Sequence, residues 1–140
     1  MSIMVDTGAW YALADTSDAN HHKAKEFYQK VAGEVPLLTT DAIFVEVWLL
    51  LRGRLGRPAA LTFWQTLREA NIEVICLTES DIEGAWQIMN TWADQDFSFT
   101  DCSTFVVMER LGITEIFTFD HHFLVYRYGP QRKKAFTCLP

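Results

Sequence analysis

The N-terminal stretch SIMVDTG, residues 2–8, decides the fold class of this chain. A short apolar run ends there at the polar turn residues Asp6, Thr7 and Gly8. Such a run predicts a buried strand that stops at a turn. Because strands buried on both faces are typical of parallel sheets, these first residues favour a parallel sheet.

Beyond this stretch, short apolar segments alternate with helical patterns. Further strands are predicted at residues 35–38, 72–77 and 113–119, with a last edge strand at 135–138. Helices are predicted, from apolar spacing and capping residues, at 19–31, 42–52, 59–70, 78–92 and 102–111. This alternation predicts an α/β domain, a single one over residues 1–140, whose parallel sheet is covered by helices on both faces.

The composition is that of a globular protein, since 49% hydrophobic residues in a chain of 140 can form one buried core. No stretch approaches the roughly 18 apolar residues of a membrane span, and the N-terminus lacks a secretory pattern. We therefore expect a cytoplasmic protein with no membrane partner. Cys76, Cys102 and Cys138 contain no Cys-x-x-Cys pair, so we expect reduced thiols in or near the core.

Taken alone, the formal net charge of −6 argues against a nucleic-acid partner, because affinity for phosphates comes mainly from Lys and Arg. The conclusion depends on where the acids lie. If four of them held two divalent cations, the net charge would become −2 and the site would be locally positive. Acidity alone therefore excludes no function here.

Two acids stand where ligands bind in open parallel sheets, outside the carboxyl ends of the strands, and two more can face the same edge. Asp6 and Asp120 end predicted strands, while Glu46 and Asp101 lie in the first turns of helices. Four carboxylates at one edge would repel one another unless cations were bound. Their hard oxygens point to Mg²⁺ or Mn²⁺.

Glu46 is the most unusual of the four, because it interrupts the apolar run IFVEVWLLL at residues 43–51. We expect that run to be largely buried, so this carboxylate needs a metal, a proton or a cationic partner. Each acid also has an ordinary interpretation: Glu46 as a buried ion-pair partner, Asp101 as a helix cap after Ser98, Asp6 and Asp120 as turn residues. Only their convergence favours function.

The segments around these acids resemble the acidic motifs of PIN-domain ribonucleases, in particular the VapC-type toxins of prokaryotic toxin–antitoxin pairs. The matching segments are VDTGAWYAL (5–13), TDAIFVE (40–46), FSFTDCS (97–103) and FTFDHHF (117–123). The resemblance implies a three-layer α/β/α domain with about five parallel strands and Mg²⁺- or Mn²⁺-dependent endonucleolytic cleavage of RNA. It also implies a homodimer and inhibition by a cognate antitoxin protein.

On this hypothesis, Asp6 and Asp101 bind the metal directly, while Glu46 and Asp120 complete the shell or orient the attacking water. The metal would bind the scissile phosphate and lower the pKa of a bound water. Thr7 and Thr118 are candidates to support these acids by hydrogen bonds. His121 and His122, an adjacent pair whose side chains diverge, are expected at the surface near the substrate.

Two basic clusters could hold RNA phosphates: Arg52, Arg54 and Arg57 after the Glu46 helix, and Arg127 with residues 132–134 near the C-terminus. The first cluster could equally serve to complement the helix dipole. The tryptophans lie on helical apolar faces, which favours core or dimer packing over base stacking.

Two other functions compete with the nuclease. One is a signalling module that resembles a response-regulator receiver, with Mg²⁺ in an acidic pocket. A receiver would require a Lys at the end of a late strand and paired acids near the first strand. This chain has only Asp6 near the first strand and has Asp120 at the end of the late one. The other is a PIN-like binding protein without catalysis. Metal-dependent RNA cleavage separates all three.

Overall fold

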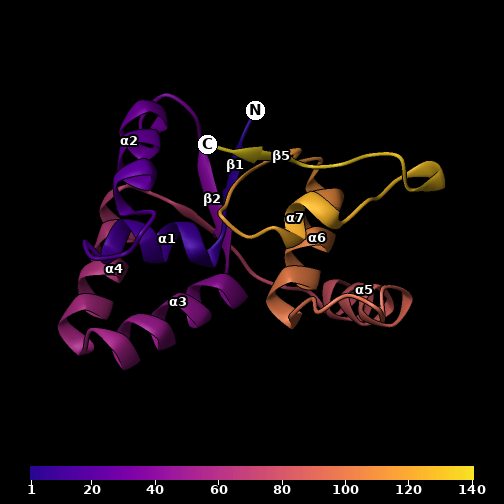
Figure 1. Cartoon of the computed structure of the whole chain (residues 1–140), viewed down its shortest axis with the longest axis horizontal. Helices are drawn as coiled ribbons and strands as arrows, with labels where there is room; N and C mark the ends of the chain where they lie inside the picture. Colours follow the sequence, from indigo (N-terminus) through magenta and orange to yellow (C-terminus); the bar gives the residue numbers. More distant parts are fainter.

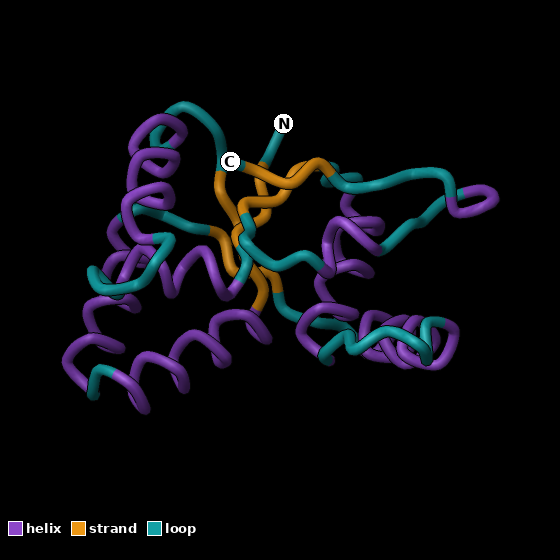
Figure 2. The backbone as a smooth tube through the Cα atoms, in the orientation of Figure 1, coloured by secondary structure: helices purple, strands orange, loops and turns teal.

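The computed structural model describes residues 1–140, and its centre is one sheet of five parallel strands (Figure 2). The strand order is β3-β2-β1-β4-β5, so β1 lies in the middle. The strands are β1 (Ile3–Val5), β2 (Leu37–Thr40), β3 (Glu73–Ile75), β4 (Glu115–Phe117) and β5 (Thr137–Leu139). The predicted parallel sheet is confirmed, and with it the strand count that the resemblance implied.

Helices cover both faces of this sheet, as predicted for a three-layer α/β/α fold. Figure 1 shows α1 to α4 on one side of the strands and α5, α6 and α7 on the other. The helices are α1 (Thr7–Ala14), α2 (His21–Val31), α3 (Asp41–Arg54), α4 (Arg57–Glu69), α5 (Glu79–Thr91), α6 (Phe99–Leu111) and α7 (His122–Val125), followed by the short 3₁₀ turn η1 (Pro130–Arg132).

Capping residues set the start of three helices. Thr40 accepts a hydrogen bond from the amide of Ile43 at the start of α3. Thr78 and Ser98 each form a full capping box with the Asp three residues later, as their spacing predicted. Gly112 ends α6 in the left-handed region, at φ 69°, where glycine has no steric penalty. These short-range signals fix where α3, α5 and α6 begin and where α6 ends.

Helix α1 was not predicted. Thr7 and Gly8 were interpreted as a polar turn, but α1 begins at Thr7 directly after β1. Asp6 occupies the N-cap position and its side chain makes no capping hydrogen bond. Asp is a preferred N-cap residue, so a sequence signal for a helix start is present and was interpreted as a turn. Because it makes no capping hydrogen bond, the Asp6 carboxylate stays available for other contacts.

Four of the five strands are shorter than predicted, whereas β2 keeps its predicted length but is displaced along the chain. β4 covers only Glu115–Phe117 of the predicted 113–119, and β2 ends two residues beyond its predicted limit, at Thr40. The edge strand β3 is largely exposed, because it pairs with β2 alone and no other strand lies beyond it. Apolar runs in this chain continue past the paired segments, so the runs overestimate strand length.

The expected burial of residues 43–51 was wrong. In α3 only Ile43, Val47 and Leu51 are buried, while Val45 and Leu49 are exposed on the opposite face. Cys76 is also exposed, contrary to the expectation for the cysteines. None of the helices is both long enough and apolar enough to span a membrane.

Candidate active site

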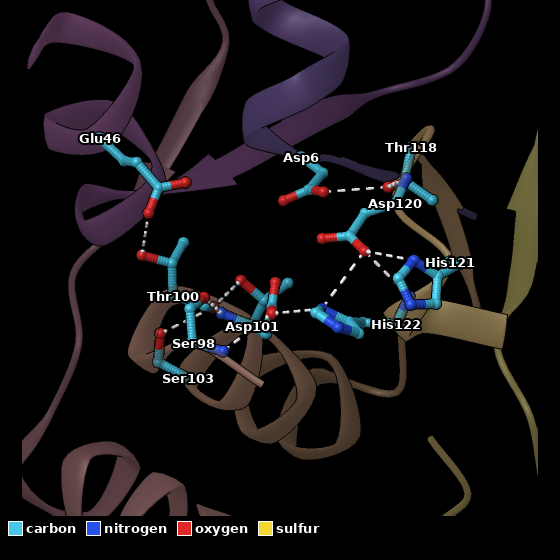
Figure 3. A network of polar contacts seen from close by, with 11 residues as sticks. Asp6, Glu46, Ser98, Thr100, Asp101, Ser103, Thr118, Asp120, His121 and His122 are labelled. Carbon is cyan, nitrogen blue, oxygen red and sulfur yellow. Dashed lines mark hydrogen bonds and ion pairs between the residues drawn. The ribbon is translucent and has the colours of Figure 1, made fainter. Parts of the chain in front are cut away.

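Four acidic side chains from four different elements line one cleft of about 310 Å³. Asp6 follows β1, Glu46 lies on α3, Asp101 lies in the first turn of α6, and Asp120 follows β4 by three residues. Figure 3 shows their carboxyl groups around a common space. β1 and β4 are paired parallel neighbours, so the residues after them emerge at the same edge of the sheet.

Asp6 is the most deeply placed of these acids, at 3% exposure. Its Oδ2 accepts a hydrogen bond of 2.9 Å from the Thr118 hydroxyl. Burial, and less strongly the charges of Asp101 and Asp120, raises the pKa of this carboxyl to about 7, against hydrogen bonds from Thr7 and Thr118 that lower it. Without a cation, Asp6 is therefore only partly ionised near neutral pH.

Asp101 combines the two roles between which the sequence could not decide. It is the capping-box residue of α6, since its Oδ2 accepts from the Ser98 amide at 3.0 Å. The same oxygen lies 2.9 Å from Nδ1 of His122. Burial, and less strongly the charge of Asp120, raises the pKa of Asp101. Because these hydrogen bonds reach Oδ2, the cap leaves Oδ1 available to a ligand.

Two threonines contact the remaining acids, Glu46 through its carboxylate and Asp120 through its backbone amide. The Thr100 hydroxyl donates to Oε2 of Glu46 at 2.8 Å, which connects α3 to α6 across the cleft. Thr118 Oγ1, which donates to Asp6, accepts a 3.0 Å hydrogen bond from the amide of Asp120. The predicted support by Thr118 is thereby confirmed, and it reaches two acids rather than one.

His122 was misplaced by the sequence analysis, which put both histidines at the surface. His121 is exposed, but the His122 side chain is only 16% exposed, and its Nδ1 lies 2.9 Å from Asp101 and 3.3 Å from Asp120. Because ionised carboxylates only accept hydrogen bonds, we assign a hydrogen to this Nδ1, which faces two of them. No spacing rule singles out this residue, because it reaches the cleft only through the turn from β4 into α7.

The donor set fits a divalent cation. Hard carboxylate oxygens dominate it, and neither Asp6 nor Glu46 forms a salt bridge with Lys, Arg or His. The hydroxyl of Thr7, which lines the same cleft, is buried without a hydrogen-bond partner, and such orphaned groups are rare in folded proteins. Asp120, His121 and His122 also bring three ligand atoms within 4.8 Å of one another.

The predicted basic clusters separate in the structure. Arg54 lines the cleft, whereas Arg52 and Arg57 do not. The guanidinium of Arg127 donates to the carbonyls of residues 124, 125 and 126, so it is engaged with the backbone at the end of α7. Lys133 and Lys134 are exposed on the segment that Figure 1 shows projecting from the body of the protein.

The chain was compared with known proteins. The family model for the PIN domain matches residues 3–127. The 23S rRNA-specific endonuclease VapC20 of Mycobacterium tuberculosis is 32% identical over 122 residues, which cover 86% of this chain and 91% of VapC20. Ribonuclease VapC26 of the same organism is 26% identical over 139 residues, covering 99% of this chain and 100% of VapC26.

The fold comparison agrees with the sequence comparison. The crystal structure of M. tuberculosis VapC20, described as a sarcin-ricin loop cleaving toxin, superposes with a TM-score of 0.81 at 30% identity. The superposition covers 88% of this chain and 93% of that one. The receiver alternative is thereby set aside. The chain belongs to the PIN domain family, among the VapC-type ribonucleases.

Proposed function

We propose that this protein is a divalent-metal-dependent endoribonuclease, the toxin of a toxin–antitoxin pair, and that Asp6, Glu46, Asp101 and Asp120 form its active site. The observation that carries the proposal is the convergence of these four acids on one cleft with no Lys or Arg paired to any of them. An acid cluster of this kind would destabilise the fold unless cations offset its charge.

The chain contributes the orientation of the acids. Thr118 fixes Asp6, Thr100 fixes Glu46, and the α6 cap with His122 fixes Asp101. Such supporting hydrogen bonds hold ligands near the geometry that a metal requires. When bound, Mg²⁺ or Mn²⁺ would supply Lewis-acid activation of water and of the RNA phosphate.

Structured ribosomal RNA is the first substrate to test, because the relative VapC20 carries that specificity in its name. We place the reaction in the cytoplasm, where such RNA is found. The proposal includes a cognate antitoxin protein that blocks the cleft, and a short open reading frame beside the gene would support it.

A homodimer is also part of the proposal. The large apolar side chains of Val45 and Leu49 on α3, Ile82 and Trp86 on α5, and Phe99 at the start of α6 are exposed. A groove of about 540 Å³ with a mainly apolar lining includes four of these five residues. Exposed apolar surface of this extent is typical of an interface, and we assign it to a second copy of the chain.

The test is an incubation of the purified protein, freed from any bound partner, with structured RNAs and Mn²⁺ or Mg²⁺. The wild type should cut, EDTA should stop the reaction, and Asp6→Asn and Asp101→Asn should each lower the rate by at least about a hundredfold. Undiminished cleavage by both variants would rule out this site. Metal binding without cleavage by the wild type would instead indicate a PIN-like binding protein.

A further inference from the structure

Arg54 is the only basic residue, Lys or Arg, among the residues that line the acidic cleft. The lining includes five carboxylates, those of the four proposed catalytic acids and of Asp18. A cation that served only to neutralise this charge would form an ion pair with one of them. Arg54 forms no salt bridge within 4.0 Å with any acid of the chain.

The guanidinium of Arg54 packs instead on an aromatic ring. Its Cζ lies 5.1 Å from the centroid of the Tyr11 ring, within the range of a cation–π contact. Tyr11 is itself buried on α1 and lines the same cleft. The ring is a rigid platform that supports the guanidinium at the mouth of the cleft.

The polar end of this platform is already engaged. The Tyr11 hydroxyl donates to Oδ2 of Asp15 at 2.6 Å, and Oδ1 of Asp15 accepts from the Ser17 amide and hydroxyl. Asp15 is thus satisfied without Arg54. Arg54 lies close enough for its charge to act on both Tyr11 and Asp15, but it forms no ion pair with Asp15. The guanidinium is exposed, so N–H donors remain for a ligand that is not part of this chain.

We propose that Arg54, supported by the Tyr11 ring, forms a phosphate-binding subsite that holds the RNA backbone beside the scissile phosphate. This inference rests on the proposed function. A guanidinium stacked on a ring presents its edge as a planar fork, which matches two oxygens of one phosphodiester. Metal ions at the carboxylates and Arg54 at the rim would together give RNA a positive path into an otherwise acidic cleft.

The competing interpretation is that Arg54 only complements the dipole at the end of α3. Arg52 lies in the same last turn, is equally exposed and does not line the cleft. Arg52→Gln therefore removes the same charge from the same helix end without touching the subsite. It is the matched control for Arg54→Gln.

The experiment measures steady-state cleavage of a hairpin that spans a cut mapped with the wild type, over a series of salt concentrations. For Arg54→Gln we expect a KM about tenfold higher with kcat within about twofold of the wild type. The slope of log KM against log salt should fall by about 0.7 to 0.9, as for the loss of one phosphate contact. Arg54→Lys should keep the slope and give an intermediate KM, since it retains charge but not the fork.

Two controls make the result decisive. Calorimetric Mn²⁺ affinity should not weaken in Arg54→Gln, because the residue is not a ligand; a weaker affinity would overturn the subsite. Equal effects of Arg52→Gln and Arg54→Gln, or an unchanged KM and salt slope in Arg54→Gln, would also overturn it. If the wild type cuts no RNA, the proposed function fails and the subsite fails with it, whereas wild-type cleavage with an unaffected variant removes only the subsite.

Discussion

Replacement of Asp6 by Asn should stabilise the metal-free protein while it abolishes activity. The Asp6 carboxyl is buried, and its pKa rises from 3.8 to about 7 on folding. This rise in pKa lowers the free energy of unfolding by about 4 kcal/mol once the carboxyl is fully ionised. Asn is neutral and can still accept the hydrogen bond from Thr118, so it avoids this cost.

The sign of the pH dependence follows from the raised pKa. The folded state binds this proton more tightly than the unfolded state, so protonation of Asp6 stabilises the folded protein. This stabilisation is complete below pH 3.8 and is lost as the pH rises through about 7. The advantage of Asp6→Asn over the wild type should therefore grow from about 1 kcal/mol at pH 4.5 to about 4 kcal/mol above pH 7.

The assay is urea unfolding in EDTA at several pH values, with Asp94→Asn as an exposed acid outside the cleft for control. Asp94→Asn should show no comparable trend. Saturating Mn²⁺ at pH 8 should reduce or reverse the difference in unfolding free energy between the two proteins. Metal binding stabilises the wild type by mass action, whereas the variant lacks one metal ligand. A metal-free Asp6→Asn protein that is less stable than the wild type at pH 8, or a difference independent of pH, would refute the reasoning.

Three further predictions concern separate parts of the structure. In His122→Asn the side-chain amide can replace Nδ1 as the group that contacts Asp101, so Mn²⁺ affinity in a calorimetric titration should stay within about threefold of the wild type. His122→Gln should bind Mn²⁺ about tenfold more weakly than the wild type. Equal losses of affinity in the two variants would contradict a positioning role. Asp81→Asn removes a buried carboxylate that caps α5 and binds Arg110 in a bidentate pair. Urea unfolding should therefore show a free energy of unfolding lower by about 2 to 3 kcal/mol. RNA cleavage per folded molecule should not change. Leu49→Glu places a charge on the exposed apolar face of α3 and should convert the proposed dimer to a monomer in light scattering. A wild type that is already monomeric would contradict the assigned face.

The sequence predicted the fold where a signal is local. The capping boxes at Ser98 and Thr78 and the glycine that ends α6 lie where the spacing placed them. Helix α1 escaped prediction because Asp6, Thr7 and Gly8 were interpreted as turn residues, although Asp is equally common at a helix N-cap, the position that Asp6 occupies. Asp6 makes no capping hydrogen bond in the structure, so its carboxylate stays available to the cleft.

The burial of α3 was overestimated for a related reason. An apolar run interrupted only by Glu46 suggests a helix enclosed on all sides, but only the face with Val47 packs into the core. The other face carries Leu49 into solvent, where a second molecule rather than this chain would cover it. A single sequence does not distinguish a core from an interface, because both select for apolar side chains.

Asp81 and Asp101 show most clearly what sequence patterns leave undecided about the site. Both are the third residue of a helix, both complete a capping box, and both are buried. Asp81 meets the guanidinium of Arg110 at 2.9 Å, which satisfies its charge, and no opening to a ligand remains. Asp101 meets only the imidazole of His122 and faces other carboxylates across the cleft. The capping pattern is identical in the two helices. What differs is the partner that the fold brings to each carboxylate, 29 residues away for Asp81 and 21 residues away for Asp101. That partner distinguishes a structural acid from a candidate metal ligand.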